Sequence, residues 1–200
     1  MAFTMVRANL EQRGFTVTEF ATAKEAADYL DGAIDGKTVG FGGSMTLTEM
    51  GLAERLGSHN ELFWHWQVKE GSTAAETLAA AVSAEVYLTS VNGLAETGEI
   101  INIDGTGNRV ASMLYGHKKV YFVVGANKLA PDYERALHRA RNIAAPKNAQ
   151  RLKRNTPCVL GERCFDCASP DRICRGLAVL WEKMGSCEME VVLVGESLGY

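Results

Sequence analysis

Hydrophobic and polar positions follow two different periods along this chain, and the period changes from one segment to the next. Residues 15–20 alternate apolar and polar side chains, which predicts a half-buried strand. Residues 22–32 carry apolar side chains at helical spacing, and Thr22 and Glu25 are spaced to form a capping box at the start of a helix. Because such changes recur along the chain, we expect strands and helices to alternate.

The same patterns predict the remaining elements. Expected helices cover residues 3–13, 22–32, 46–56, 72–81, 108–114 and 131–142. Expected strands cover residues 15–20, 37–41, 61–66, 85–89, 99–103 and 119–124, and two closing runs, 177–183 and 188–195, are suited to pair with each other. The alternation predicts an α/β fold with a mainly parallel sheet and helices on both faces.

Length and composition agree with a single folded domain. The chain has 200 residues, of which 46% are hydrophobic and 22% charged, a balance that excludes a wholly disordered chain. A core of this size needs no disulfide bonds. We expect residues 1–150 to form the α/β core, and residues 151–200 to add a cysteine-containing segment and the closing strands to the same domain.

Charge and hydropathy exclude two classes of partner. The chain has 21 Lys and Arg against 24 Asp and Glu, a net charge of −3, whereas nonspecific binding of nucleic acid needs a basic excess. No apolar run approaches the roughly 18 residues of a membrane span, and the first residues lack the features of a signal peptide. We therefore expect a cytoplasmic protein with no membrane span and no nucleic-acid partner.

Glycine-rich polar loops follow four of the predicted strands, at residues 42–46, 90–97, 104–109 and 125–128. The strand ends of a parallel sheet are where ligands bind, and the helix start after residue 44 favours an anion. The alternative is a set of tight turns, but four such loops at one edge favour a site for a small carboxylate or phosphate compound. The candidate ligand-binding residues are Gly43, Ser44, Thr46, Asn92, Thr97, Asp104, Thr106, Asn108, Arg109, Lys128, Asn142 and Lys147.

Two carboxylates are candidates for catalysis. Glu96 and Glu99 flank a Thr-Gly turn, and either can serve as a nucleophile or general base if it is desolvated. The alternative is a pair of solvated loop carboxylates. Asp104 and Asn108 have equally plain alternatives, as a turn residue and as a helix cap.

Four of the five cysteines, Cys158, Cys164, Cys167 and Cys174, fall within 17 residues at the spacing C-x5-C-x2-C-x6-C, and Cys187 stands apart as an expected strand residue. Four thiolates suit tetrahedral zinc or an iron–sulfur cluster. The segment around them is hydrophilic, so a metal would supply order that apolar packing does not. The alternative is a set of reduced thiols in a loop. We expect these four cysteines to bind either zinc or an iron–sulfur cluster.

Histidines, tryptophans and a basic run have structural interpretations. We expect His59, His65, His117 and His138 to be structural or exposed. Trp64 and Trp66 are expected to share one face of a strand, in packing or at an interface such as that of a homo-oligomer. The basic residues Lys147, Arg151, Lys153 and Arg154 are expected to form a solvated face, with binding of an acidic partner as the lesser interpretation.

Several blocks along the chain resemble the LUD domain of lactate-utilisation proteins, the family that includes LutC and LldG. The blocks are residues 42–46 (GGSMT), 49–52 (EMGL), 96–100 (ETGEI), 102–110 (NIDGTGNRV), 123–128 (VVGANK) and 141–148 (RNIAAPKN). They occur in the order of the family and extend over nearly the whole chain. The cysteine segment departs from the LutC pattern and is similar to that of a stand-alone variety of LUD protein.

The resemblance implies a fold like that of NagB, ribose-5-phosphate isomerase and the CoA transferases. In CoA transferases a loop glutamate is the nucleophile, and Glu96 or Glu99 is the nearest equivalent here. The family further implies a link to oxidation of L-lactate to pyruvate beside iron–sulfur partner subunits. We therefore expect an accessory or electron-transfer-associated subunit with a polar ligand site and a cysteine-bound metal. The alternatives are an enzyme of the isomerase or CoA/acyl-transferase type, or a ligand sensor with structural zinc.

Overall fold

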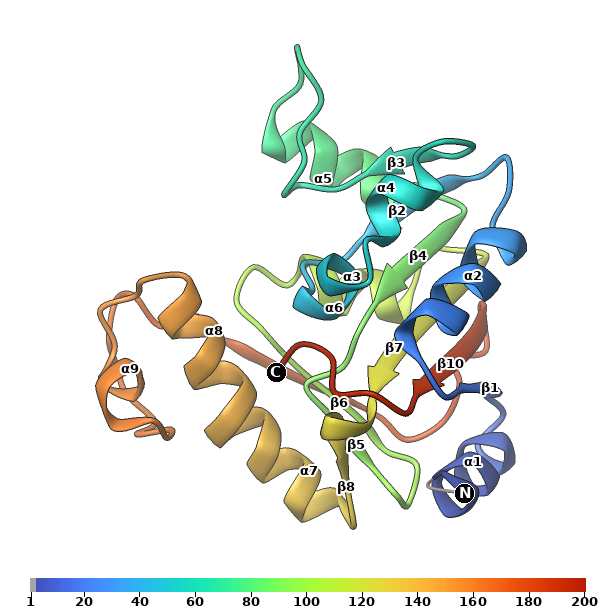
Figure 1. Cartoon of the computed structure of the whole chain (residues 1–200). Coiled ribbons are helices and arrows are strands. Elements are labelled where there is room, and N and C mark those ends of the chain that lie inside the picture. The colour runs from blue at the N-terminus through green and yellow to red at the C-terminus, as the bar shows by residue number, and fades with distance from the viewer. Residues whose placement is uncertain (1–2) are drawn as a thin grey trace.

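The computed structural model describes residues 3–200 and contains two β-sheets with helices packed around them (Figure 1). The strands are β1 (Thr16–Phe20), β2 (Thr38–Phe41), β3 (Glu61–Phe63), β4 (Val86–Thr89), β5 (Gly93–Ala95), β6 (Ile100–Asp104), β7 (Lys119–Gly125), β8 (Leu129–Ala130), β9 (Gly176–Leu180) and β10 (Glu188–Val194). The α-helices are α1 (Thr4–Gln12), α2 (Ala23–Ala33), α3 (Met45–Glu49), α4 (Leu52–Leu56), α5 (Ala74–Val82), α6 (Asn108–Leu114), α7 (Tyr133–Arg139), α8 (Ala145–Arg151) and α9 (Pro157–Gly161). A 3-10 turn, η1 (Ala126–Lys128), and a π-helical turn, η2 (Ala140–Ala144), complete the elements.

The larger sheet has six parallel strands in the order β1-β10-β7-β4-β2-β3. This confirms the predicted α/β class. The position of β7 inside this sheet explains why its sequence is a continuous apolar run. Val120 and Phe122 pack into one core, and Tyr121 and Val123 pack into another on the opposite face. A strand of a parallel sheet is buried on both faces, so it has no polar side to alternate with.

Helices cover one face of this sheet, and helices together with the smaller sheet cover the other. The first core joins the sheet to α2, α3 and α4, and the second joins it to α1, α6 and strands of the smaller sheet. A third cluster packs α7 on the far side of the smaller sheet. No helix among residues 3–200 is long and apolar enough to cross a membrane.

The smaller sheet has the order β8-β5-β6-β9, and β6 runs antiparallel to both of its neighbours. The prediction that the two closing runs pair with each other is therefore wrong. Strand β9 pairs with β6, whereas β10 lies between β1 and β7 in the larger sheet. Burial explains the separation. Six of the seven residues of β10 are buried, as a central strand requires, whereas β9 has exposed positions that suit the edge of a sheet.

Two predicted helices differ from the expectation. The segment 46–56 forms two short helices, α3 and α4, because Gly51 between them adopts a left-handed conformation with φ of 62°. The helix expected to end near residue 142 instead continues through η2 and α8 to Arg151. Pro146 has no backbone N–H to donate, and the π-helical turn directly before α8 changes the hydrogen-bond register there.

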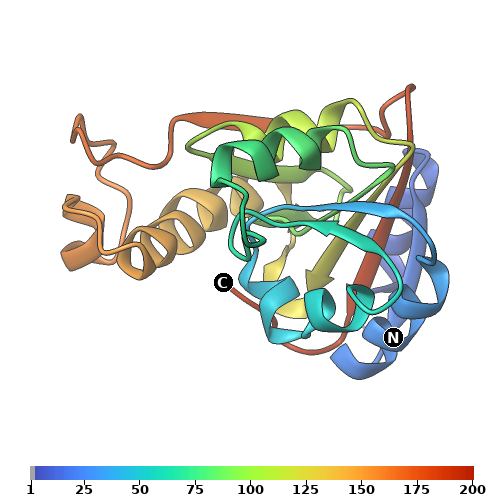
Figure 2. The same cartoon turned by 90° about the horizontal axis from the view of Figure 1, so that it is seen from above.

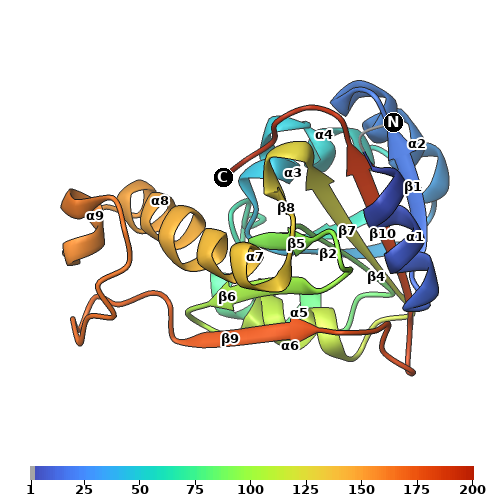
Figure 3. The same cartoon turned by 90° about the horizontal axis from the view of Figure 1, so that it is seen from below.

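The capping box predicted at Thr22 and Glu25 is confirmed, and α6 has the predicted bounds. Helix α8, helix α9 and the loop that leads to β9 extend away from both sheets, as Figures 2 and 3 show from opposite sides. We call residues 145–175 the cysteine arm. Its position matters for the site, because one side of the arm faces the ends of the central strands.

Candidate functional site

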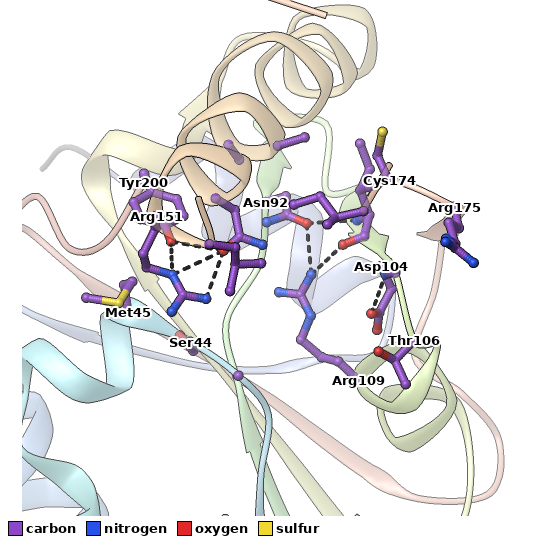
Figure 4. A pocket seen from close by; sticks show the side chains of 18 of the residues that line it. Ser44, Met45, Asn92, Asp104, Thr106, Arg109, Arg151, Cys174, Arg175 and Tyr200 are labelled. Atoms are coloured by element: carbon purple, nitrogen blue, oxygen red, sulfur yellow. Dashed lines mark hydrogen bonds between the residues drawn. The ribbon is translucent and has the colours of Figure 1, made fainter. Parts of the chain in front are cut away.

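A cavity of about 620 Å³ lies where loops after β2, β4 and β7 meet the start of α6 and the cysteine arm (Figure 4). Its volume is in the range of sites for small molecules. Because the larger sheet is parallel, the carboxyl ends of its strands share one edge, and the cavity occupies the position where such sheets bind ligands.

Eight of the predicted ligand-binding residues line this cavity. They are Gly43, Ser44, Asn92, Asp104, Thr106, Asn108, Arg109 and Lys128. Three of the four predicted loops follow strands of the larger sheet, but loop 104–109 follows β6 of the smaller sheet. Packing of the two sheets therefore brings together loops that the sequence placed on a single sheet.

Lys128 is the most buried charged group of the cavity wall, with 3% of its surface exposed. It lies at the end of η1, directly after the central strand β7. Its ammonium nitrogen donates to the hydroxyl oxygens of Thr46 at 2.8 Å and of Ser90 at 2.9 Å. Burial, together with the positive charges of Arg139 and Arg109, lowers the pKa of Lys128 from 10.5 to about 7. Both hydroxyl partners are neutral, so an anionic ligand would supply the missing negative charge.

Arg139 joins two of the strand-end loops and does not itself line the cavity. Its guanidinium donates to the carbonyl oxygen of Asn92 at 2.6 Å and to that of Asn127 at 2.8 Å. The side chain is 8% exposed, and burial lowers its pKa to about 10. Sequence reasoning did not single out this residue, which positions the loops that carry Asn92 and Lys128.

Arg109 reaches across the cavity from α6. Its Nη2 donates to Asn92 Oδ1 at 3.0 Å and to the carbonyl oxygen of Ile103 at 2.6 Å, as the dashed lines of Figure 4 show. Burial lowers the pKa of this guanidinium, and the nearby Asp104 opposes that shift. Only one of its nitrogens is used in these bonds, so the rest of the guanidinium remains suited to a carboxylate or phosphate.

Asp104 has the structural role that the sequence left as its alternative. Its carboxylate accepts from the backbone N–H of Gly105 at 2.7 Å and from that of Val110 at 3.0 Å. The second bond caps the first turn of α6, which has no capping side chain at Gly107. Asp104 thereby fixes the helix that carries Arg109.

The cysteine arm supplies cavity residues that sequence reasoning missed. Arg151 donates to Tyr200 Oη at 2.8 Å and to Asn148 Oδ1 at 3.0 Å. Its guanidinium also lies 4.5 Å from the centre of the Trp66 ring. Arg151 is exposed, as expected of a solvated face, but it also lines the cavity. Asn148 and Arg151 are three residues apart in α8, and that helical spacing is the signal that places both on one face.

Trp66 and His65 also line the cavity, after β3 rather than within it. A Cβ atom at Gly43 would lie 2.9 Å from the Trp66 ring, so only glycine permits this close approach. Trp64 is buried and stacks on Trp66 with ring centres 5.5 Å apart. Burial lowers the pKa of His65, whose buried Nδ1 has no hydrogen-bond partner among the described residues.

The cavity is strongly basic within an acidic chain. Its wall carries six basic side chains, Lys128, Arg109, Arg151, Arg154, Arg172 and Arg175, against two carboxylates, Asp104 and Asp171. The whole chain has a net charge of −3. Such a concentration of positive charge in a concave site attracts anions.

Both predicted catalytic carboxylates lie outside the lining of this cavity. Glu99 Oε1 forms an ion pair with Arg13 Nη2 at 2.7 Å, and its other oxygen accepts from the hydroxyl of Thr97. The backbone carbonyl oxygen of Glu96 accepts a hydrogen bond from the Asn9 side chain, and its backbone N–H donates to the carbonyl oxygen of Ala130. These contacts join the loop after β5 to β8 and to the C-terminal part of α1 with the residue after it, and a catalytic role for Glu96 or Glu99 stays a prediction.

The other predicted ligand-binding residues lie beside or away from the cavity. Thr46 is fully buried behind Lys128 and does not line the cavity. Asn142 accepts from the backbone N–H of Cys164 at 3.1 Å and so holds the cysteine loop. Lys147 is exposed on α8, and Thr97 is exposed beside Glu99.

The four clustered cysteines are half-buried free thiols in the cysteine arm. Among residues 3–200, no group of three or more His, Cys, Asp or Glu side chains is arranged to hold a single metal ion. This arrangement by itself gives no support for a bound metal, and the zinc and iron–sulfur alternatives both stay predictions. Cys187, expected in a strand, is buried one residue before β10.

Comparison with known proteins decides the family. The profile of the LUD domain matches residues 3–194. The chain belongs to the LUD domain family. The match extends from α1 to the end of β10, so it includes every loop of the cavity except the C-terminal residues. LUD domains are generally tied to lactate utilisation.

The LUD domain described here also has a relative among solved structures. A crystal structure of a DUF162 family protein from Deinococcus radiodurans, determined at 1.70 Å resolution, superposes with a TM-score of 0.55. The superposition covers 97% of this chain and 96% of that chain, at 14% sequence identity. At this identity the likeness shows the fold alone. No curated protein matches the chain.

Proposed function

We propose that this LUD-domain protein binds a small anionic metabolite, a carboxylate or phosphate compound, in the cavity at the strand ends and acts in lactate utilisation. The observation that carries the proposal is the buried amine of Lys128, which bonds two neutral hydroxyls within a cavity wall of six basic side chains. A ligand carboxylate or phosphate group would offset the repulsion between Lys128 and Arg109.

A thermal-shift titration tests this proposal. The full chain is titrated with L-lactate, pyruvate, ribose 5-phosphate and acetyl-CoA, which represent the carboxylate, phosphate and thioester classes. A ligand at 100 times its Kd stabilises the folded state by about 2.7 kcal/mol, which raises the Tm of a domain of this size by roughly 5–10 °C. Trp66 lines the cavity, so its fluorescence gives a second, direct readout.

The matched variants are Lys128→Met and Lys37→Met. Lys37 is exposed between α2 and β2, outside the lining of the cavity. We expect Lys128→Met to lose the ligand-dependent shift and Lys37→Met to keep it. Absence of a shift with all four compounds, or an equal loss in the two variants, would count against the proposal.

The finer role of an accessory or electron-transfer-associated subunit is supported by the resemblance to lactate-utilisation proteins. Its test is capture of a lactate-oxidising partner from the native cell extract with the tagged full chain, followed by assay of lactate oxidation in the captured fraction. The alternative of a CoA-transferase-like enzyme has less support, because Glu96 and Glu99 lie outside the cavity.

A further inference from the structure

The cysteine arm contains a second, smaller pocket, separate from the basic cavity. All four clustered cysteines, Cys158, Cys164, Cys167 and Cys174, line this pocket. They come from three parts of the arm: α9, the loop after it and the turn before β9. Four of the chain's five cysteines thus line one pocket, although they are spread over 17 residues of sequence.

Two hydrogen-bond donors are directed at one sulfur atom of this pocket, that of Cys164. The backbone N–H of Asp166 donates to Cys164 Sγ at 3.3 Å, and Arg141 Nη2 donates to the same sulfur at 3.6 Å. Asp166 has a φ of 47°, the left-handed conformation, in the turn between Cys164 and Cys167. Thr156 Oγ1 lies 3.2 Å from Cys158 Sγ. Such bonds stabilise and tune sulfur ligands of metal centres.

Two arginines, Arg141 and Arg172, line the pocket, and both also pair with the carboxylate of Asp166, at 3.4 Å and 3.0 Å. Arg172 donates to the carbonyl oxygen of Cys167 at 2.8 Å and to that of Cys174 at 2.9 Å, so its guanidinium ties together two of the cysteine backbones. Metal-binding cysteines are thiolates, and nearby guanidinium groups stabilise that negative charge.

The four thiols line one pocket without converging on a single ion, an arrangement that favours a cluster over zinc. Zinc draws its thiolates to about 2.3 Å from one point, and no three of the described His, Cys, Asp or Glu side chains are arranged to hold an ion. A cluster separates its cysteine ligands farther, because iron and sulfide atoms lie between them. We propose that Cys158, Cys164, Cys167 and Cys174 bind an iron–sulfur cluster in the pocket of the cysteine arm.

The proposed cluster would lie beside the anion cavity. Ala145, Arg172, Ile173 and Cys174 line both the small pocket and the basic cavity. A redox centre held there would share wall residues with the basic cavity. The proposal itself depends only on the cysteines and stands or falls independently of anion binding.

Anaerobic purification of the full chain tests the proposal. The expected protein is brown, contains iron and acid-labile sulfide in equal amounts, and has a visible absorption band that bleaches when dithionite reduces it. A sample that is colourless as purified is reconstituted with ferrous iron and sulfide before it is scored. Zinc in place of iron, or no metal binding after reconstitution, would overturn the proposal.

Cys187 offers a matched control for the four cysteines proposed to bind the cluster. Cys167→Ser and Cys158→Ser should each lose most of the visible absorption and iron, whereas Cys187→Ser should keep both, because Cys187 is buried beside β10 and away from the arm. Far-UV circular dichroism confirms that each variant is folded. Retention of the full spectrum by Cys167→Ser and Cys158→Ser, or its loss in a folded Cys187→Ser, would contradict the assignment.

Discussion

The ammonium nitrogen of Lys128 lies 2.9 Å from the hydroxyl oxygen of Ser90, in a wall where Lys128 is 3% exposed and has no carboxylate partner among the residues described. Ser90 Oγ donates in turn to the carbonyl oxygen of Val123 at 2.6 Å. The ends of β4 and β7 thus hold the amine in one position. Because burial lowers the pKa of this amine, Lys128 affects the free energy of unfolding as well as anion binding.

The first prediction concerns the pH dependence of stability. The pKa of Lys128 is about 7 in the folded chain and near 10.5 when unfolded, so between these pH values the unfolded chain binds more protons. The contribution of Lys128 to the free energy of unfolding should therefore rise as the pH increases from 7 to 9.5. Urea denaturation of the wild type and Lys128→Met at several pH values measures it. The difference between the two should move in favour of the wild type as pH rises, whereas Lys37→Met should show no such trend.

The second prediction concerns Arg109 and anion binding. Arg109→Met removes a guanidinium from the cavity wall, and hydrogen bonds to charged groups contribute about 1.5–3 kcal/mol. We expect the Kd for pyruvate or for inorganic phosphate to rise roughly tenfold or more, measured by calorimetry or Trp66 fluorescence. The control is Arg135→Met, because Arg135 is exposed on α7. Equal affinities in the wild type and Arg109→Met would show that the anion binds elsewhere.

The third prediction concerns the candidate catalytic carboxylates. Glu99 pairs with Arg13 at 2.7 Å and does not line the cavity. We expect Glu99→Gln to lower the free energy of unfolding by roughly 1 kcal/mol and to leave the Kd for pyruvate unchanged. Glu96→Gln should change neither quantity measurably. A large loss of ligand affinity in either variant would restore that glutamate as a site residue.

The fourth prediction concerns a buried ion pair in the larger sheet. Glu190 is 1% exposed in β10 and accepts from Lys119 Nζ at 2.8 Å and from Tyr29 Oη at 2.7 Å. Burial and the adjacent carboxylate raise the pKa of Tyr29 to about 12. Lys119→Met leaves the carboxylate without a cation and should destabilise the chain by about 3 kcal/mol. Glu190→Gln should have a smaller effect, since an amide still bonds its neighbours and Lys119 is partly exposed to water. Urea denaturation ranks the two variants, and the opposite order would contradict this account.

Local patterns in the sequence were sufficient for most of the elements. The capping box at Thr22 depends only on Glu25 three residues later, and the apolar run of β7 needs no partner to be recognised. The same is true of the glycine-rich loops, whose residues Gly43, Asn92 and Arg109 line the cavity. These features follow from interactions within one or two turns of chain, which the sequence shows directly.

Pairing over long distances in sequence could not be predicted in this way. The strand pattern of β9 and β10 suggested a pair, but β10 lies between β1 and β7, which precede it by many residues. Arg151 is exposed as expected, but nothing in its sequence neighbourhood shows that Trp66 and Tyr200 lie against it.

By itself, the sequence determined the α/β class, the LUD resemblance, the strand-end loops and the cysteine spacing. Only the tertiary structure decided that two sheets, not one, form the cavity, that Glu96 and Glu99 lie outside it, and that all four arm cysteines line one pocket. The physical reason is that local hydrogen bonding and side-chain periodicity set the elements, whereas burial of apolar surface between distant segments sets which of their ends meet.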